Sequence, residues 1–488
     1  MNTRLVLRIL LVIGLGGIVF LLVRVSGYII IAPGYPIDQA TWPRISLTAK
    51  SGASLSSLEI NVSDIVPWSN VLLTLDDRPL AIDTWHKNPG LDSWTWIWRT
   101  SVPSERAYQL VFYHDCHTGC VERGRLSVSP AWVTPAPALM RRPTKLGVVF
   151  ANPLRNWHQR SGWDVELTYA TQASPGYTID ELATRVQRAN ESGLRVLIRV
   201  DYQKGQSIPP REDEAALAEY LIYVRRLARD ARLHNVYAFV IGSGYNEQGS
   251  NQLAGGKMVT PDWYARVFNG YGIEANRTDN VIQVIHQEYP TVRVLVGPVR
   301  PWNRDQDGKL TWVIDAPWLN YMNTLVYTVS QAAQEKATAG IPLASPDGFA
   351  IQASGRPEAP DLAGQDRALE PATDLRQPSW NGAQTGFRVY QDWLAIINTN
   401  PTTRGLPVFI TSTNTFTADT NVQPARNYPS GWLTHALTEV NVKPQIVALC
   451  WFIDDLPDAQ WDEFSLSKQT GNLSSAAREF EALLQMMP

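Results

Sequence analysis

A carboxylate and an amide stand side by side directly after an apolar run of the chain. The run covers residues 236–242, and Tyr245, Asn246 and Glu247 follow it before a loop rich in Gly, Ser and Asn. Short apolar runs bounded by turn residues are typical of buried strands, so these side chains are expected at a strand end. A carboxyl group exchanges protons, and an amide both donates and accepts hydrogen bonds. The pair is therefore placed for proton transfer or for binding a ligand.

Eight apolar runs alternate with amphipathic segments over residues 146–488. The runs are 146–151, 165–170, 195–201, 236–242, 292–298, 348–353, 407–412 and 446–452. The segments between them have helical spacing, and Thr178 with Glu181 forms a capping box before one of them. The weakest helical pattern is that of 153–163, which would supply the first helix. This alternation predicts an α/β fold, a (β/α)8 TIM barrel with 236–242 as its fourth strand.

The part of the chain before the barrel has a different pattern. Residues 43–130 alternate apolar and polar positions with a period of two, and turn residues separate the runs. This pattern predicts a small all-β sandwich domain. The stretch 131–145 is rich in Pro and has no periodicity, so we expect a linker there.

The first 32 residues carry a membrane signal. Arg4 and Arg8 precede an uninterrupted apolar run over residues 9–23. The positive charges predict a cytoplasmic N-terminus, an N-terminal transmembrane helix as anchor, and an extracytoplasmic location for the rest of the chain. A removed signal peptide is the alternative, and it gives the bulk of the chain the same location.

Cysteines and charges limit the possible partners. Cys116 and Cys120 are close enough to form a disulfide in an exported chain. His114 and His117 lie beside them, but one tight loop offers poor tetrahedral geometry, so no metal site is expected. The net charge of −3, from 46 acidic and 43 basic residues, predicts no nucleic-acid partner. Nucleotide-binding and zincin motifs are absent from the sequence, and no cofactor is expected.

At its strand ends the sequence resembles the clan A glycoside hydrolases, retaining (β/α)8 enzymes whose fourth strand ends in Asn-Glu. The resemblance implies that Glu247 is the general acid/base and that Asn246 binds the sugar next to the scissile bond. Residues 448–455, Ala-Leu-Cys-Trp-Phe-Ile-Asp-Asp, are similar to the aromatic eighth-strand end of those barrels. Trp451 would then form the floor of the sugar subsite.

The seventh strand departs from that family. There the nucleophile ends a pattern like Pro-x-x-Ile-Thr-Glu, whereas here Pro407 opens Pro-Val-Phe-Ile-Thr-Ser and Ser412 takes the place of the nucleophile. No Glu occurs between Arg404 and Thr438. A serine hydroxyl attacks an anomeric carbon poorly without an activating base, so the two-step retaining route is in doubt.

Other residues at strand ends could complete a site. Asp454 is the first candidate for a substitute carboxylate, and Asp201, Glu166 and Asp455 are further candidates. A carboxylate farther from Glu247 than in a retaining enzyme would leave room for a water molecule and allow hydrolysis with inversion. A polar cleft floored by Trp is expected from side chains at or near strand ends, namely Arg199, Tyr245, Arg300, Trp302, Gln352, Ser412 and Asn414. Salt bridges and caps at the barrel rim are the alternative for each of them.

The sequence predicts a membrane-anchored, extracytoplasmic protein like a glycoside hydrolase that cleaves or binds a glycan. The 18 Trp residues, many in polar surroundings, suit stacking against sugar rings, although ordinary core packing is the alternative. Two other functions stay open. One is a glycan-binding pseudoenzyme in which Ser412 records the loss of chemistry, and the other is a protein-interaction scaffold.

Overall fold

The computed structural model describes most of the chain after the N-terminal segment. The described residues are 43–51, 55–88, 93–103, 108–116, 120–128, 138–171, 176–303, 316–355, 376–377, 382–416 and 422–486. The predicted membrane anchor at 1–32 lies outside these residues. The long stretch 353–380, for which the sequence favours a lid or substrate-facing loop after the sixth strand, also lies mostly outside them. Among the described residues, no helix is both long and apolar enough to cross a bilayer.

Two antiparallel sheets precede the barrel. The first has the order β5-β6-β2-β1-β9 and the second β4-β3-β7-β8. Their strands are β1 (Arg44–Ser51), β2 (Leu55–Asp64), β3 (Leu72–Leu75), β4 (Arg78–Leu80), β5 (Ile82–Lys87), β6 (Trp94–Pro103), β7 (Tyr108–His114), β8 (Val121–Val128) and β9 (Ala138–Leu139). The inner faces share one apolar core, in which Trp96 and Trp98 of β6 pack against Phe112 of β7. Part of the predicted linker therefore pairs as strand β9.

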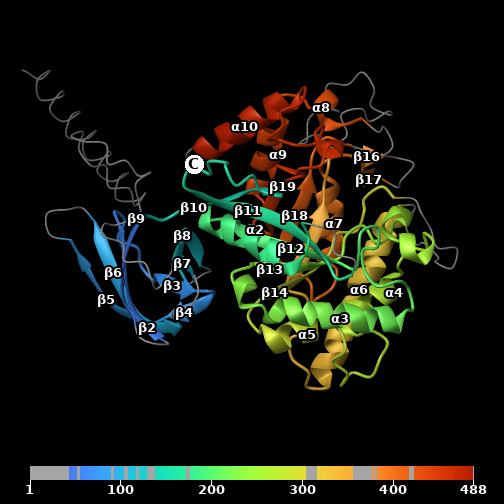
Figure 1. Ribbon diagram of the computed structural model, residues 1–488, viewed down its shortest axis with the longest axis horizontal. Helices are drawn as coiled ribbons and strands as arrows, with labels where there is room; N and C mark the ends of the chain where they lie inside the picture. The colour runs from blue at the N-terminus through green and yellow to red at the C-terminus, as the bar shows by residue number, and fades with distance from the viewer. Residues whose placement is uncertain are drawn as a thin grey trace, which may run out of the picture. The chain divides into compact units, whose positions relative to one another are not determined.

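Eight parallel strands close into a barrel, as the sequence predicts (Figure 1). They are β10 (Arg142–Val149), β11 (Arg160–Tyr169), β12 (Arg195–Asp201), β13 (Ala238–Ile241), β14 (Arg293–Val296), β15 (Gly348–Gln352), β18 (Val408–Thr413) and β19 (Ile446–Trp451). Pairing of β10 with β19 closes the ring. Side chains from alternate positions, including Trp163, Leu197 and Phe409, fill the barrel interior. The short pair β16 (Arg376–Gln377) and β17 (Ala383–Gln384) lies outside the ring.

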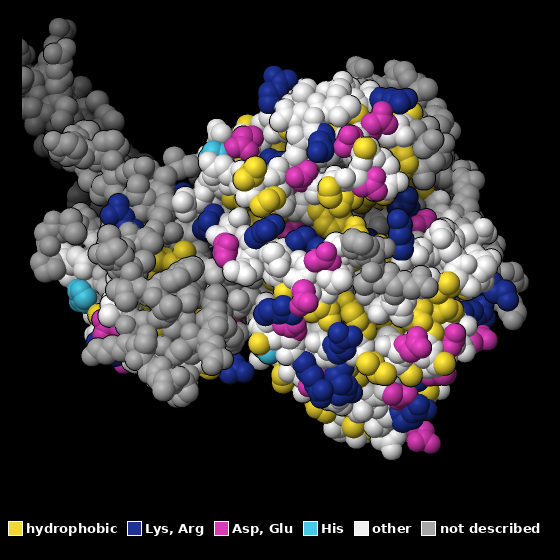
Figure 2. Space-filling view, in the orientation of Figure 1, with side chains coloured by type: hydrophobic (Ala, Val, Ile, Leu, Met, Phe, Trp, Pro, Cys, Tyr) yellow, Lys and Arg dark blue, Asp and Glu magenta, His cyan; other side chains and the backbone are white. Residues whose placement is uncertain are grey.

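Helices follow most of the barrel strands. They are α2 (Ile179–Glu191), α3 (Glu214–Arg229), α4 (Pro261–Asn269), α5 (Val281–Glu288), α6 (Pro317–Thr338), α7 (Val389–Ile397), α8 (Pro424–Asn427), α9 (Trp432–Asn441) and α10 (Leu473–Gln485). The predicted capping box of Thr178 and Glu181 is present at the start of α2. Charged side chains of both signs are interspersed on the visible face, in keeping with the small net charge (Figure 2).

The expectation of a first helix within 153–163 is wrong. The chain passes from β10 to β11 through turns, and β11 already begins at Arg160. His158 and Gln159 adopt left-handed φ values of 45° and 58°, which a right-handed helix does not contain. Asn152 and Asn156 accept backbone N–H bonds two residues ahead, which stabilises turns in place of a helix.

Candidate active site

A cleft of about 970 Å³ opens at the carboxyl ends of the barrel strands. Eight of the residues singled out from the sequence line it, namely Arg199, Asp201, Glu247, Arg300, Trp302, Gln352, Ser412 and Asn414. Parallel barrel strands bring residues that are far apart in sequence to one rim, which is where barrel enzymes build their sites. Tyr245, Asn246, Trp451 and Asp454 are not among the residues that line this cleft.

Glu247 reaches the cleft through a tight turn after β13. Gly242 and Gly244 adopt φ values of 69° and 65°, a conformation that glycine allows without strain. The amide of Glu247 donates to the carbonyl of Gly244 at 3.0 Å. A Cβ atom on Gly244 would lie only 3.1 Å from Oε1 of Glu247, so glycine also leaves room for the carboxylate.

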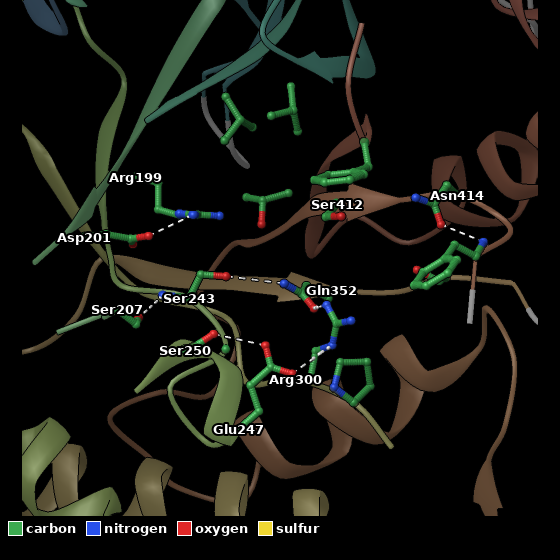
Figure 3. A pocket seen from close by; sticks show the side chains of 18 of the residues that line it. Arg199, Asp201, Ser207, Ser243, Glu247, Ser250, Arg300, Gln352, Ser412 and Asn414 are labelled. Carbon is green, nitrogen blue, oxygen red and sulfur yellow. Dashed lines mark hydrogen bonds and ion pairs between the residues drawn. The ribbon is translucent and has the colours of Figure 1, made fainter. Parts of the chain in front are cut away.

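The Glu247 carboxylate is held by one hydroxyl and one cation. Ser250 Oγ donates to its Oε1 at 3.0 Å, and Arg300 Nε lies 3.5 Å from its Oε2 (Figure 3). The side chain of Glu247 remains 30% exposed. It is therefore fixed in position and still accessible from the cleft.

Further polar contacts join the strand ends around Glu247. Arg300 Nη1 lies 3.5 Å from Oε1 of Gln352, whose Nε2 is 3.3 Å from Oγ of Ser243. The backbone N–H of Ser243 donates to Ser207 Oγ at 2.6 Å. These contacts connect the segments that follow β12, β13 and β14 with the end of β15, so the rim is held together by side chains as well as by strand pairing (Figure 3).

Asp201 is a second carboxylate in the same cleft. It ends β12, and Arg199 Nη2 donates to its Oδ2 at 2.8 Å. The residue is only 5% exposed, and its Oδ1 has no hydrogen-bond partner among the described residues. Burial raises the pKa of Asp201 to about 6, against the opposing charge of Arg199. Asp201 and Glu247 are the only acidic residues among the described residues that line the cleft.

The alternation of β12 explains why Asp201 faces the cleft. Leu197 points into the barrel, and Arg199 and Asp201 lie two and four residues further on, so all three share one face. This two-residue alternation is a signal in the sequence that could have ranked Asp201 above the other candidates for the second carboxylate of the cleft.

The side chains of Tyr245 and Asn246 have internal partners instead of facing the cleft. The Asn246 amide accepts from the backbone N–H of Arg300 at 2.7 Å and donates to the carbonyl of Arg300 at 3.1 Å. Tyr245 is fully buried, and its hydroxyl donates to the carbonyl of Gly297 at 2.8 Å. Asn246 therefore positions the segment that carries Arg300, next to Glu247.

The structure also corrects the expectation that Trp451 forms the floor of the sugar subsite. Trp451 is fully buried on the outer side of β19 against Trp432 of α9, because Ala448 and Cys450 take the inward positions. Its indole N–H donates to the carbonyl of Phe464 at 3.0 Å. The aromatic lining of the cleft comes from other side chains, which are Tyr169, Trp302, Phe416, Phe452, Trp461 and Phe464.

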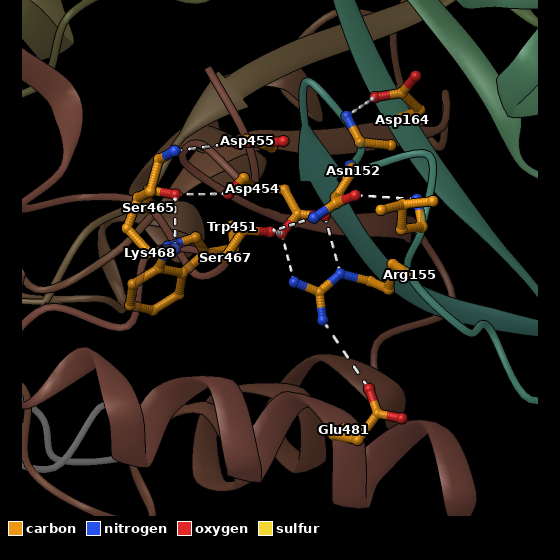
Figure 4. A network of polar contacts seen from close by, with 12 residues as sticks. Asn152, Arg155, Asp164, Trp451, Asp454, Asp455, Ser465, Ser467, Lys468 and Glu481 are labelled. Atoms are coloured by element: carbon orange, nitrogen blue, oxygen red, sulfur yellow. Dashed lines mark hydrogen bonds and ion pairs between the residues drawn. The ribbon is translucent and has the colours of Figure 1, made fainter. Parts of the chain in front are cut away.

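Asp454 lies in a buried polar network away from the cleft (Figure 4). Its Oδ2 accepts from Arg155 Nε at 2.8 Å and from the backbone N–H of Asn152 at 2.9 Å. Ser467 Oγ donates to its Oδ1 at 3.0 Å. Arg155 also approaches Glu481 of α10 at 3.8 Å. These contacts join the end of β19 to the loop between β10 and β11. Because these partners satisfy the carboxylate, Asp454 is not placed to act on a ligand in the cleft.

Two remaining expectations concern the cysteines and Ser412. Cys116 and Cys120 form a disulfide, as predicted, and Cys450 is a buried thiol. The described residues contain no cluster of three or more His, Cys, Asp or Glu that could hold a metal ion. Ser412 lines the cleft at the end of β18.

Together the closed parallel barrel and its cleft define a (β/α)8-barrel protein. No protein-family model matches the sequence, and a comparison with curated proteins finds no match. Among solved structures, the chain is similar to a glucosidase from Croceicoccus marinus, with 14% identity over 64% of this chain and a TM-score of 0.38. The chain spans 60% of the length of that glucosidase.

Two further solved structures are similar over a comparable share of the chain. A xyloglucanase from Paenibacillus pabuli is 14% identical over 67% of this chain and 86% of its own, with a TM-score of 0.36. An endoglucanase from Clostridium acetobutylicum is 13% identical over 67% of this chain and 84% of its own, with a TM-score of 0.35. These structures are glycoside hydrolases, and a likeness of this size does not fix the activity of the present chain.

Proposed function

We propose that the protein binds a glycan in the barrel cleft and hydrolyses a glycosidic bond there. The observation that carries the proposal is the presence of two carboxyl groups, on Asp201 and Glu247, in one cleft at the strand ends. Hydrolysis of a glycosidic bond needs one group that gives a proton to the leaving oxygen and one that acts on the opposite side of the sugar.

The remainder of the cleft lining suits a sugar. Aromatic faces such as that of Trp302 stack on the apolar side of a pyranose ring, and Arg300, Gln352 and Asn414 offer hydrogen bonds to hydroxyl groups. The volume of the cleft, about 970 Å³, is large enough to hold more than one sugar unit of a polysaccharide.

The proposed reaction is a direct displacement by water. Asp201, whose pKa burial raises to about 6, holds a proton in mildly acidic solution and gives it to the glycosidic oxygen as the bond to the anomeric carbon breaks. A water molecule forms the new bond to that carbon and loses a proton to Glu247. Ser412 offers no carboxylate at the end of β18, so this route involves no glycosyl-enzyme intermediate on that strand.

A glycan-binding protein without catalysis is the second candidate. It is favoured by Ser412 and by the amide of Asn246, which is committed to the backbone of Arg300 instead of a sugar hydroxyl. In that case the same aromatic and polar groups bind the glycan, and the two carboxylates serve only as hydrogen-bond acceptors.

We also propose that the protein is exported and anchored in the cell membrane by residues 1–32. Arg4 and Arg8 before the apolar run support this orientation. The disulfide between Cys116 and Cys120 is consistent with an oxidising compartment. Protease treatment of intact and of lysed cells tests the location, because an extracytoplasmic barrel is degraded in both samples.

The experiment that tests the function is product release from a panel of polysaccharides and cell-wall glycans. The wild-type protein is compared with Glu247→Gln and Asp201→Asn, and Glu335→Gln, which changes an exposed carboxylate on α6, is the matched control. We expect release of sugars by the wild type and the control and loss of release in the two cleft variants. Retention of a glycan by all four proteins without any release would favour the non-catalytic candidate.

A further inference from the structure

One side of the barrel cleft carries its charges. Every charged residue among the described residues that line the cleft belongs to β12 or follows β13 or β14, namely Arg199, Asp201, Glu247 and Arg300 (Figure 3). Gln352, at the end of β15, adds an amide to the same side. Because β12, β13, β14 and β15 are neighbours in the ring, these groups form one continuous polar side.

The other strands of the ring give the cleft an apolar wall. Strands β18, β19, β10 and β11 are also neighbours, and the pairing of β10 with β19 joins them across the closure of the barrel. The apolar wall consists of residues from β10 and β11 and from the segments after β18 and β19, namely Val149, Val165, Phe416, Phe452, Trp461 and Phe464. The polar residues Ser412 and Asn414 of the β18 segment lie between the two sides in chain and ring order.

The four aromatic side chains of the apolar wall contact one another. The ring of Phe464 lies 5.4 Å from that of Phe416 and 5.7 Å from that of Phe452, centroid to centroid. Trp461 lies 5.7 Å from both Phe452 and Phe464, and all of these contacts are edge-on. Phenylalanine has no polar atom in its side chain, so this wall suits an apolar group better than the hydroxyl groups of a further sugar unit.

Asn414 holds Phe416 in this cluster. Its side-chain Oδ1 accepts from the backbone N–H of Phe416 at 2.8 Å (Figure 3). Such a bond from an Asn side chain to the backbone two residues ahead stabilises a turn. Phe416, Phe452 and Trp461 are only half-buried, so the wall keeps apolar surface that a ligand can cover.

Asp201 lies at the border between the polar side and the apolar wall. In the pairing of β11 with β12, Asp201 stands opposite Tyr169, and β11 also carries Val165 of the wall. Glu247 follows β13, one strand further from β11. In the proposed reaction Asp201 gives its proton to the glycosidic oxygen, so this oxygen must lie at the border, with the sugar toward Glu247 and the leaving group toward the wall.

We infer that the glycan carries an apolar aglycone, an alkyl or aryl group, which packs on the apolar wall of the cleft. The inference rests on the proposed function, because it takes the position of the sugar from the two carboxyl groups. As the bond from the anomeric carbon to the glycosidic oxygen breaks, the proton of Asp201 joins that oxygen and the aglycone leaves as a neutral alcohol or phenol. The oxygen of water forms the new bond to the anomeric carbon and its proton passes to Glu247.

Isothermal titration calorimetry of the full-length protein tests the inference by binding alone. The probes are the methyl, butyl and phenyl β-glycosides of glucose, galactose, mannose and xylose, whose aglycones are too small to act as detergents. For at least one sugar we expect the butyl or the phenyl glycoside to bind about tenfold more tightly than the methyl glycoside, which is the gain from burying about two further methylene groups. A preference for butyl would indicate an alkyl chain such as that of a glycolipid, and a preference for phenyl would indicate an aryl glycoside.

Two variants place that preference on the apolar wall. Trp461→Ala removes a half-buried side chain of a short 3-10 helix, Ala459–Trp461, and Phe416→Ala is the second variant should the first fail to fold. Each is expected to lower the ratio of the two affinities by about threefold or more, because each removes part of the apolar contact. Trp85→Ala, which removes a 61% exposed Trp from the sandwich, is the matched control and should leave the ratio unchanged.

The outcomes separate this inference from the proposed hydrolysis. A preference for the apolar aglycone in a protein that releases no sugar from any glycan would support the inference and refute hydrolysis. Release of sugar by a protein with equal affinities in every series would leave hydrolysis standing and overturn the inference. Absence of binding in all series, or a preference that survives both Trp461→Ala and Phe416→Ala, would also overturn it.

Discussion

Arg199 and Asp201 stand two residues apart on β12, and their side chains meet at 2.8 Å inside the cleft. Arg199 compensates the charge of Asp201 only in part, because burial still raises the pKa of the carboxyl group to about 6. The pair therefore keeps a proton available at a pH where an exposed aspartate has already lost its own. This property gives the first prediction.

The stability of the protein should fall between pH 4 and pH 7 because of Asp201. Its pKa is about 6 in the folded state and near 3.8 in the unfolded state, so between these values the folded state binds more protons. Stability from this group is full below the lower pKa and is lost as the pH rises through the higher one. The loss amounts to about 3 kcal/mol, from about 1.4 kcal/mol for each pKa unit.

Urea unfolding of the wild type and Asp201→Asn at pH 4 and pH 7 measures this effect. The variant does not titrate at this position. Between pH 4 and pH 7 the free energy of unfolding of the wild type should therefore fall by about 2 kcal/mol relative to that of the variant, because pH 4 already lies just above the unfolded-state pKa. Effects of the substitution that do not depend on pH cancel in this comparison. Parallel pH profiles for the two proteins would show that Asp201 is not perturbed.

Glu247→Gln should lower the turnover of a cleaved glycan by about 10²-fold to 10⁴-fold. The carboxamide keeps the size and the hydrogen bond with Ser250 but cannot take up a proton from water. Glycan affinity should change much less than turnover, since most of the cleft lining is unaltered. Initial rates and equilibrium binding on the same oligosaccharide separate the two effects. A proportional loss of both would indicate that Glu247 only binds the ligand.

The barrel could be predicted from the sequence because each of its strands is short and contains an apolar run. Runs such as 195–201 and 446–452 are buried on both faces, and that burial is what the sequence pattern records. The first connection could not be predicted in this way, since its turn depends on left-handed residues such as His158 and on side-chain bonds from Asn152. Apolar periodicity contains no information on either.

The site was predicted in part for a similar reason. Position at a strand end correctly brought Glu247 and Ser412 to the cleft, because parallel strands share one rim. Position at a strand end did not distinguish Asp201 from Asp454, because the direction of a side chain depends on the face of the strand that carries it. The direction of Asp454 also depends on a partner 299 residues away in the sequence, Arg155. Trp451 was misplaced because the inward positions of β19 belong to Ala448 and Cys450.

Asn246→Ala should destabilise the protein and also impair the cleft. The variant loses two hydrogen bonds to the backbone of Arg300 and leaves those groups without their partner, which costs about 1–3 kcal/mol. Arg300 lies beside Glu247, so turnover should fall even where the protein is fully folded. Denaturant unfolding and the rate at low temperature measure the two effects. Normal turnover in a destabilised protein would show that the bonds serve stability alone.

Asp454→Asn should unfold the barrel more readily without changing the chemistry of the cleft. The carboxylate is fully buried, and its substitution leaves the guanidinium of Arg155 without its main counter-charge. Removing one partner of a buried ion pair typically costs about 3–5 kcal/mol. Asp458→Asn, which changes an exposed carboxylate four residues further on, is the matched control and should have little effect.

Because Asp454 does not line the cleft, the folded fraction of Asp454→Asn should keep the glycan affinity and turnover of the wild type. Thermal unfolding together with rates below the transition separates stability from activity. Loss of turnover in a variant as stable as the wild type would return Asp454 to the catalytic site.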